Sequence, residues 1–483
     1  MLHLLADEPT IDTGNTTWLL VSTALVLLMT PGLAFFYGGL NRAKSVLNMM
    51  MMSFVTIGLV SVLWLIYGFS LAFGTNDNAM VNDFIGSFSQ YLGGATGDVF
   101  GEFWVAGGAS TGIPVFVFMA FQMMFAIITV ALISGALSDR TKFAGWLLFA
   151  FGWFTLVYVP VAHWIWGGGF IGMDIKALDF AGGTAVHINA GAAALGVAIV
   201  LGKRIGWPKE AFRPHNVPFV ALGAGLLWFG WFGFNAGSEL TADGTAAVAF
   251  INTQVATSAA LLGWILVEWV KSGRPTLVGA SSGAVAGLVA ITPACGFISP
   301  WAAVILGLVA GAVCALAVSL KYRFGFDDSL DVVGVHFVGG WIGSLSLGLF
   351  ANDFVNSWIT DPNILGASNG LFYGGGLTQL GRQALASGIV SVYSFGVAAL
   401  IALLVKVTIG LRTSAETEVE GIDVAEHAEG AYEFAATGGS AGAFALAGIG
   451  APKAAAPAEI AETEAEPVAD EPAAAPETEK VAG

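Results

Sequence analysis

The chain alternates long apolar runs with short polar segments over most of its length. An apolar run of about 20 residues is long enough to cross a bilayer as a helix. The stretch 75–112 is rich in Gly, Asn and Asp and is too weakly apolar to span, so we expect a loop there. The pattern predicts an all-α polytopic membrane protein with eleven transmembrane helices, at about 18–38, 48–74, 113–137, 143–163, 184–202, 216–236, 245–270, 276–294, 301–320, 330–350 and 384–409.

The distribution of basic residues predicts how these helices are oriented. With the N-terminus outside, fourteen Lys and Arg residues fall on the cytoplasmic side, and only Lys176 and Arg382 fall outside. Cytoplasmic loops of membrane proteins carry the excess of Lys and Arg. We therefore expect an extracellular N-terminal segment at 1–17, a cytoplasmic C-terminus and a location in the plasma (inner) membrane. Residues 1–17 lack the basic region of a signal peptide.

The first ten helices divide into two sets of five, at about 18–202 and 216–350, and the last helix follows at about 384–409. Because five is odd, the second set enters the membrane inverted relative to the first. His187 and His336, 149 positions apart, lie on the last helix of each set. Inverted repeats bring equivalent residues together near the membrane midplane, so we expect these two histidines to meet there.

Each histidine has an aspartate eight residues upstream, Asp179 and Asp328. Ionisable side chains at membrane depth are costly and usually functional. Two neutral imidazoles can share one proton, which suits a neutral hydrogen-bonding substrate or a proton relay. Two ordinary core histidines are the alternative, and a metal site lacks a third ligand at a fitting spacing. We expect no metal, no cofactor and no enzymatic activity.

The two aspartates also have two interpretations. A carboxylate near the start of a helix caps free N–H groups and complements the helix dipole. The other interpretation is direct electrostatic help for a passing cation. Asp331 competes with Asp328 for the capping role.

Aromatic and polar residues occur together at several helix ends. Aromatic faces attract a small cation by about 0.5–2 kcal/mol, and a serine hydroxyl can accept one hydrogen bond from it. Aromatic residues also occur simply as interface anchors or packed side chains, so a cation site is one of two interpretations. The residues concerned are Phe121 and Phe125 on the third predicted helix, Trp166 at the outer end of the fourth, and Trp231, Phe234 and Ser238 near the outer end of the sixth.

The net charge of −16 comes mostly from the C-terminal part of the chain. Residues 414–483 contain 15 acidic residues and two lysines, a net charge of −13. The acidity therefore says nothing about a transported species. Residues 435–483 form a tail rich in Ala, Pro and Glu that cannot bury a core, and we expect it to be disordered.

Several long motifs occur together in the chain, at 31–40, 179–189, 231–238, 291–298 and 331–340. They read PGLAFFYGGL, DFAGGTAVHIN, WFGFNAGS, ITPACGFI and DVVGVHFVGG, and they resemble the ammonium transporter (Amt/Mep/Rh) family over about residues 18–434. The resemblance implies eleven transmembrane helices, with the membrane domain at 18–412, and a homotrimer with one pore in each protomer. The aromatic-plus-serine set is similar to that of the bacterial Amt branch. Phe337 departs from the family, because Gly is common at that position.

The resemblance also implies roles for individual residues. Phe125 and Phe234 resemble a stacked aromatic gate, and with Trp166 and Ser238 they resemble an ammonium recruitment site. His187 and His336 resemble the twin histidines of the pore. Asp179 resembles the aspartate below the recruitment site, and Asp328 resembles its counterpart in the second half. We expect these two aspartates and Trp231 to support the site. Residues 413–434 resemble a cytoplasmic regulatory region that meets a PII-type nitrogen regulator, and His427 within it is expected at the surface.

The function implied is ammonium uptake, with methylammonium as an analogue of the substrate. Ammonium would be recruited, deprotonated and conducted as ammonia past the histidines, with or without coupled proton transfer. The alternative is an ammonium sensor that signals through its C-terminal region with little flux. Nothing in the chain points to a nucleic-acid partner.

Overall fold

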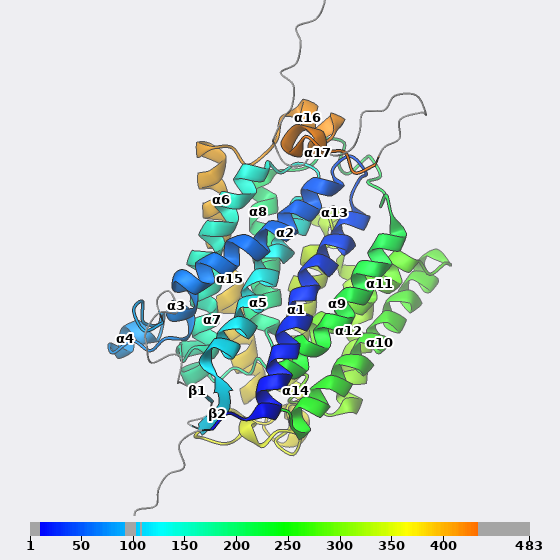
Figure 1. Ribbon diagram of the computed structural model, residues 1–483. Helices are drawn as coiled ribbons and strands as arrows, with labels where there is room; N and C mark the ends of the chain where they lie inside the picture. Colours follow the sequence, from blue (N-terminus) through cyan, green and yellow to red (C-terminus); the bar gives the residue numbers. More distant parts are fainter. Residues whose placement is uncertain (1–9, 92–102, 107–108, 433–483) are drawn as a thin grey trace, which may run out of the picture. The chain divides into compact units, whose positions relative to one another are not determined.

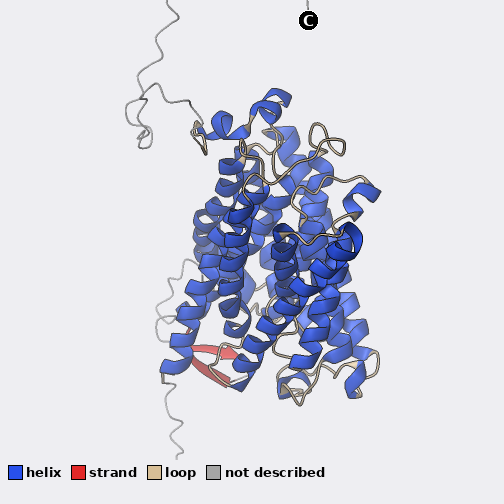
Figure 2. Ribbon diagram, turned by 90° about the vertical axis from the view of Figure 1, so that its right-hand side faces the viewer, coloured by secondary structure: helices blue, strands red, loops and turns tan. Residues whose placement is uncertain are grey.

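The computed structural model describes residues 10–91, 103–106 and 109–432. This part of the chain is a bundle of long helices with a short β-hairpin near one end and two short helices at the other (Figure 1; Figure 2). The elements of the first half are α1 (Thr13–Leu40), α2 (Val46–Leu63), η1 (Trp64–Gly68), α3 (Phe69–Phe73), α4 (Ala79–Asn82), β1 (Phe103–Ala106), β2 (Ala109–Pro114), α5 (Val115–Ile133), η3 (Ser134–Leu137), α6 (Phe143–Trp153), η4 (Phe154–Tyr158), α7 (Val159–Trp166), η5 (Ile171–Ile175), η6 (Gly183–Ile188) and α8 (Asn189–Leu201).

The second half continues in the same style. Its long helices are joined by short connections, and the last two helices belong to the C-terminal segment. The elements are α9 (Val217–Gly237), α10 (Gly244–Ser272), α11 (Leu277–Ile291), α12 (Pro300–Ala317), α13 (Leu320–Phe324), η7 (Val333–Phe337), α14 (Val338–Phe350), η8 (Ser357–Ile359), η9 (Leu371–Tyr373), α15 (Thr378–Thr408), α16 (Ala415–Glu420) and α17 (Ile422–His427).

Ten helical stretches among the described residues are long and apolar enough to cross a membrane. They coincide with ten of the eleven predicted spans. The remaining predicted span, 276–294, corresponds to α11, which is apolar but has only 15 residues. The candidate membrane spans in the described residues are therefore all helical, as expected for a multi-pass protein.

Two helices begin earlier than predicted, for identifiable reasons. The first helix begins at Thr13 rather than 18, because the Asp12 side chain caps it by accepting a hydrogen bond from the Asn15 N–H at 2.8 Å. The last span begins at Thr378 rather than 384. Its first turns contain Gln383, a polar residue that is buried and exchanges two hydrogen bonds with the backbone of Leu178, at 2.7 and 2.8 Å.

The loop predicted at 75–112 contains regular structure. Its described residues include the short helix α4 and the strands β1 and β2, which pair antiparallel and lead directly into α5. The all-α prediction therefore misses one hairpin outside the spans. That hairpin lies at the end of the bundle opposite α16 and α17 (Figure 1).

Small residues allow the helices to approach closely, as is usual in membrane bundles. Helix α1 lies along α9 (Figure 1), and a Cβ on Gly223 would lie 2.2 Å from the backbone nitrogen of Phe36. Helix α10 meets α12 in the same way, because a Cβ on Gly311 would lie 2.0 Å from the carbonyl oxygen of Ala260.

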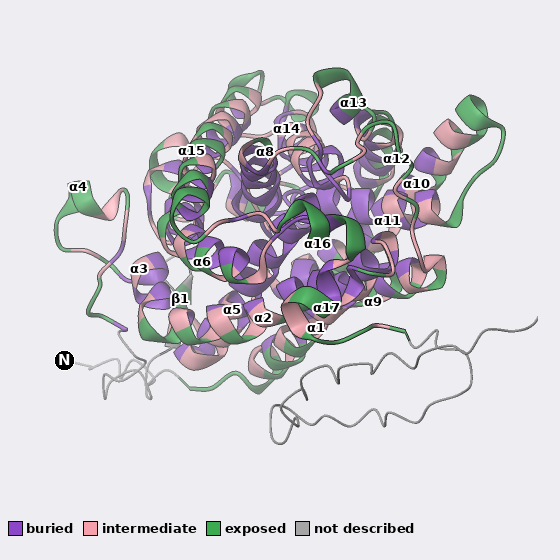
Figure 3. Ribbon diagram, turned by 90° about the horizontal axis from the view of Figure 1, so that it is seen from above, coloured by how far each residue is buried: buried purple, intermediate pink, exposed green. Residues whose placement is uncertain are grey.

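Buried residues concentrate in the middle of the bundle, and exposed ones lie around its edge (Figure 3). The edge is itself apolar. Leu266 and Trp269 on α10 and Trp301 on α12 are 59%, 60% and 81% exposed. Large apolar side chains at such exposure fit contact with lipid or with another subunit.

The segment after the last span packs on the end of the bundle. Glu418 is 2% exposed and forms an ion pair with Arg412 at 2.6 Å. The Asp423 carboxylate accepts hydrogen bonds from the backbone N–H groups of Leu47 and Asn48, at 3.0 and 2.8 Å, and so caps the start of α2. His427, expected at the surface, is half-buried, and its Nε2 lies 2.9 Å from Oδ1 of Asn48.

Loops at this same end are joined by buried ion pairs. Arg204, 5% exposed, contacts Asp327 at 2.9 Å and Asp139 at 3.3 Å. Arg140 is fully buried and donates to the carbonyl oxygen of Asp327 at 2.6 Å. Each charge is paired, which is what burial of charged groups requires.

Candidate functional site

His187 and His336 meet in the middle of the bundle, as their matched positions predict. Their Nδ1 atoms are 3.3 Å apart, their ring planes are inclined by 23°, and both side chains are buried. A neutral imidazole has one N–H and one bare nitrogen, so one ring donates to the other across this contact. Nε2 of His187 has no hydrogen-bond partner among the described residues.

Both histidines lie in π-helical turns, η6 and η7. Such turns are rare, and they occur frequently at functional sites. The Asp179 carboxylate caps η6 by accepting from four backbone N–H groups, those of residues 182 to 185, at 2.7 to 3.0 Å. Asp328 caps η7 through the N–H groups of Val332 and Val333, at 3.1 and 2.7 Å. Asp331 instead pairs with Lys321 at 2.7 Å.

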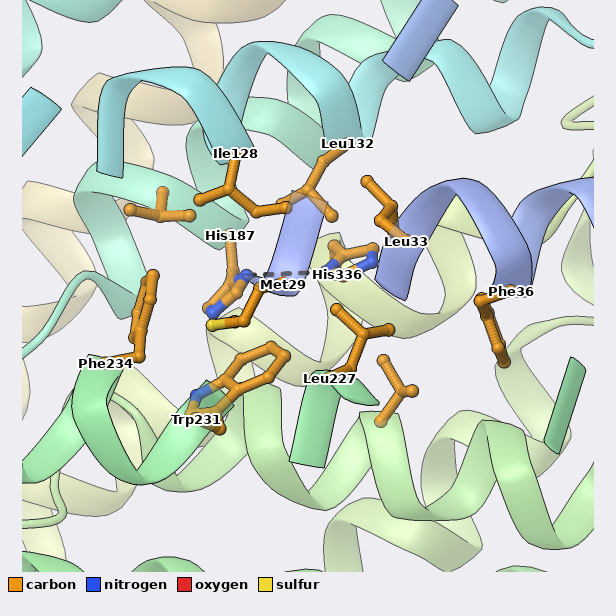
Figure 4. Close-up of a pocket in the computed structure, with 12 residues that line it drawn as sticks. Met29, Leu33, Phe36, Ile128, Leu132, His187, Leu227, Trp231, Phe234 and His336 are labelled. Carbon is orange, nitrogen blue, oxygen red and sulfur yellow. Dashed lines mark hydrogen bonds between the residues drawn. The ribbon is translucent and has the colours of Figure 1, made fainter. Parts of the chain in front are cut away.

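The histidine pair borders a narrow apolar cavity, which we call the histidine cavity (Figure 4). Its volume is about 10 Å³, at the lower limit for a single water molecule. Of the residues that line it, only His187, His336 and Trp231 have a side-chain nitrogen or oxygen. It is lined by Met29, Leu33, Phe36, Ile128, Leu132, Val186, His187, Leu227, Trp231, Phe234, Val285 and His336.

Phe234 lines the histidine cavity, and the ring of Phe125 packs against its ring. Their rings are stacked, with centroids 4.1 Å apart and planes inclined by 20°, and both are buried. Phe234 lies over His187, at 6.1 Å between ring centroids. Phe121, the other aromatic of α5 noted in the sequence, packs against Phe125 at 4.9 Å.

A second cavity of about 140 Å³ lies on the other side of the two phenyl rings, and we call it the vestibule. Trp166, the last residue of α7, and Ser238, at the C-terminal end of α9, both border it. Trp166 stands edge-on to Phe125 at 6.2 Å and 87°. The vestibule is lined by Phe73, Trp104, Phe118, Gln122, Phe125, Trp166, Phe180, Ser238 and Leu240.

The predicted cation site and histidine pair are thus neighbours separated by two rings. Trp231 contacts both the histidine pair and a neighbouring helix end. Its indole stacks on His187 at 5.4 Å and 20°, and its Nε1–H donates to Oγ1 of Thr292 at 2.8 Å. The Thr292 hydroxyl lies 3.2 Å from Oδ1 of Asn235, so a hydrogen-bonded chain supports this wall of the histidine cavity.

Several residues of the vestibule were not found from the sequence. Phe118 and Gln122 precede Phe125 by seven and three residues on α5, a spacing that places them on one helix face. The helical spacing from Phe125 could therefore have indicated both residues. Trp104, whose ring stacks on Phe118 at 3.7 Å and 12°, lies in the hairpin, and nothing in its local sequence indicates that position.

No group of three or more His, Cys, Asp or Glu residues in the described chain is arranged to hold a metal ion. Prediction of a metal-free site therefore stays a prediction. The geometry itself is that of a hydrogen-bonding pair beside a narrow apolar cavity, with a neighbouring aromatic cavity that can attract a small cation.

Comparison with known proteins identifies the family. The Ammonium Transporter Family model matches residues 17–432. An ammonium transporter of Mycobacterium bovis is 56% identical over 448 residues, which cover 89% of this chain and 92% of the relative. The crystal structure of Saccharomyces cerevisiae Mep2 is 35% identical, with a TM-score of 0.75 and coverage of 84% of this chain and 91% of that one.

A structure described as a sensor Amt protein is also similar, at 27% identity and a TM-score of 0.76 over 86% of this chain and 98% of that one. The family match covers the spans, the histidine pair and the vestibule. This chain is a multi-pass membrane protein that belongs to the Ammonium Transporter Family.

Proposed function

We propose that the protein takes up ammonium across the plasma membrane by recruiting it in the vestibule and conducting ammonia through the histidine cavity. The observation that carries the proposal is the sequence of sites: an aromatic cavity with Ser238, a stacked pair of rings, and a histidine pair in an apolar cavity of about 10 Å³. In the vestibule, the rings of Phe125 and Trp166 attract the cation, and Ser238 accepts one of its N–H groups.

The narrow apolar cavity makes deprotonation the cheaper route. A bare ammonium ion in an apolar medium costs up to tens of kcal/mol. Removing its proton at pH 7, from a pKa near 9, costs roughly 3 kcal/mol at about 1.4 kcal/mol per unit. Neutral ammonia then passes His187 and His336 by hydrogen bonding. The proton either follows over the imidazoles or stays outside, and potassium is rejected because it has no proton to lose.

The finer architecture belongs to the same proposal. We count α11 as the remaining span, which brings the number of transmembrane helices to eleven with α15 as the last. We arrange the first ten as an inverted five-plus-five repeat, and place the vestibule outside with the C-terminal segment in the cytoplasm. The supports are the fourteen-to-two distribution of basic residues and the matched histidines. The exposed apolar residues on α10 and α12 fit a homotrimer interface.

The C-terminal segment is proposed as a regulatory region that meets a PII-type regulator. It contacts the starts of two membrane helices, through Asp423 at α2 and through Glu426, which accepts from the Phe143 N–H at 3.1 Å at α6. Displacement of the segment would therefore change the ends of helices that belong to the bundle.

Ammonium-evoked currents in proteoliposomes, recorded together with internal pH, test the proposal. We compare the wild type with His187→Ala, using Phe354→Ala, at a 94% exposed position, as a matched control. A saturable wild-type current that His187→Ala loses or makes unselective supports conduction past the histidines with charge. Internal alkalinisation without current supports passive ammonia conduction.

The sensor alternative is favoured by one observation, the similarity to the sensor Amt structure. It predicts saturable ammonium binding with neither current nor alkalinisation in the same vesicles. That result would replace uptake by sensing as the function.

A further inference from the structure

An ammonium ion that leaves water for the vestibule needs hydrogen-bond acceptors. It carries four N–H donors, and each donor left unpaired in a water-poor cavity is costly. Aromatic faces satisfy the charge but only weakly satisfy directional donors. The wall of the vestibule is mostly aromatic, with six Phe or Trp residues among the nine that line it.

Most polar groups near the vestibule are already engaged. Both carboxylate oxygens of Asp179 accept from backbone N–H groups, four in all. The Trp166 Nε1–H donates to the Asp179 carbonyl oxygen at 3.0 Å. The Ser238 hydroxyl donates to the Phe234 carbonyl oxygen at 2.8 Å, which leaves only its oxygen lone pairs for a ligand.

Gln122 is the exception. Its side chain lines the vestibule, is 9% exposed, and has an Oε1 atom with no hydrogen-bond partner among the described residues. A buried amide oxygen without a donor is unusual and calls for a specific reason. Gln122 lies one helical turn before Phe125 on α5, so its amide and the ring of the gate border the same cavity.

We propose that Gln122 is a ligand of the recruited cation, its amide oxygen accepting one ammonium N–H while Ser238 accepts another. The inference rests on the proposed recruitment of ammonium in the vestibule and adds to it a second hydrogen-bonding ligand. Oε1 has no donor among the described residues and is itself buried, so the amide turns toward the vestibule and gains an ammonium N–H donor when the site is filled.

These ligands favour a cation that carries N–H donors over a cation that carries only charge. Two neutral oxygens and the faces of Phe125 and Trp166 offer directional acceptors, but no carboxylate oxygen is free among the residues that line the vestibule. An alkali cation has no N–H group, so it forms no hydrogen bonds with the two acceptor oxygens and retains its hydration shell. The amide of Gln122 therefore contributes to selection for ammonium over potassium at the entrance.

Three variants at this position separate binding from structure. Gln122→Leu keeps the volume and removes the acceptor, Gln122→Glu keeps the shape and adds a negative charge, and Gln122→Asn keeps the amide but withdraws it by one methylene. Ser238→Ala, which removes the other acceptor, and Phe354→Ala serve as comparisons. Each protein is reconstituted in full length, and its folding is checked by size-exclusion chromatography and tryptophan fluorescence.

Initial uptake is measured against ammonium concentration, with and without potassium. We expect Gln122→Leu to raise the half-saturating concentration about tenfold, the factor for about 1.4 kcal/mol and the low end for one hydrogen bond to a charged group. The maximal rate changes less than about twofold, because the histidine cavity is untouched. Gln122→Glu restores or lowers the half-saturating concentration and makes potassium a competitor.

A Gln122→Leu protein that folds and has an unchanged half-saturating concentration would overturn the inference. So would an equal fall in maximal rate for Leu and Glu, since that marks a structural role. If Ser238→Ala raises the half-saturating concentration and Gln122→Leu does not, recruitment in the vestibule stands and the role of Gln122 fails. If the wild type shows no saturable uptake or binding, both fail together.

Discussion

The aspartate caps of the two histidine turns allow a quantitative comparison within one chain. Asp179 accepts four backbone N–H groups, two on each carboxylate oxygen, at 2.7 to 3.0 Å. Asp328 accepts only two, one on each oxygen, at 3.1 and 2.7 Å. Replacing either aspartate by asparagine leaves a single acceptor oxygen in nearly the same shape. Asp179→Asn therefore loses about two hydrogen bonds, and Asp328→Asn loses about one.

The expected costs follow from these numbers. A hydrogen bond to a charged group is worth about 1.5–3 kcal/mol, and a buried N–H without a partner is costly. We expect Asp179→Asn to destabilise the fold by roughly 3–6 kcal/mol and Asp328→Asn by about half of that. Because Asp179 caps the turn that holds His187, ammonium transport should fall in parallel with stability.

Thermal unfolding followed by tryptophan fluorescence, at one scan rate in one detergent, measures the difference. The midpoint should fall about twice as far for Asp179→Asn as for Asp328→Asn, and transport in proteoliposomes should fall in the same order. Equal shifts, or a larger shift for Asp328→Asn, would refute the hydrogen-bond count as the cause. Asp179→Glu, which keeps the charge but displaces the oxygens, separates charge from geometry.

Three further predictions concern packing, pH and the C-terminal segment. Gly191→Val should cost roughly 1–3 kcal/mol by overpacking and reduce transport, because a Cβ at residue 191 would lie 2.6 Å from the Phe337 nitrogen beside the histidine pair; unchanged transport would contradict this. Burial raises the pKa of Asp327, but the hydrogen bond from Arg204 and the charges of Arg140 and Arg204 outweigh it and hold that pKa below its ordinary value. The ionised Asp327 carboxylate therefore stabilises the fold fully above about pH 4, and this stabilisation is lost as the pH falls through the lowered pKa. Below about pH 4, the unfolding temperature of the wild type should decrease, and that of Asp327→Asn should decrease less steeply. Asp423→Asn keeps one acceptor for the two N–H groups at the start of α2, and we expect faster proteolysis of the C-terminal segment with altered transport; wild-type cleavage rates would count against the cap.

The spans were predictable because a bilayer imposes a length and a composition that can be read directly from the chain. The exceptions show what such patterns miss. Gln379 and Gln383 lower the apolar character at the start of α15, yet both are buried and hydrogen-bonded, so the helix begins earlier than its hydropathy indicates. Hydropathy alone does not distinguish a polar residue that is buried and hydrogen-bonded in the bundle from one that is exposed to water.

The arrangement of the candidate site was predictable in part, where local sequence patterns mark the residues. His187 and His336 could be paired from their matched settings, and Phe125, Trp166, Phe234 and Ser238 from their motifs. Trp104 could not, because its place over Phe118 depends on how the hairpin folds back on α5. The hydrogen-bonded chain behind Trp231 also joins helices far apart in sequence, and no local pattern specifies such a contact.

The local repeat around the two histidines extends further than the aspartates. Five residues before each histidine the backbone is left-handed, at Gly182 with φ 113° and at Asp331 with φ 64°. Four residues after each histidine there is a glycine that faces the residue following the other histidine.

This packing is reciprocal. A Cβ on Gly191 would lie 2.6 Å from the nitrogen of Phe337, and one on Gly340 would lie 3.1 Å from the nitrogen of Ile188. Reciprocal contacts of this kind are what the proposed inverted repeat would produce. The absence of a side chain at both glycines lets the backbones approach until the two Nδ1 atoms are 3.3 Å apart. The distance between the two imidazoles therefore depends on Gly191 and Gly340, each four residues beyond a histidine.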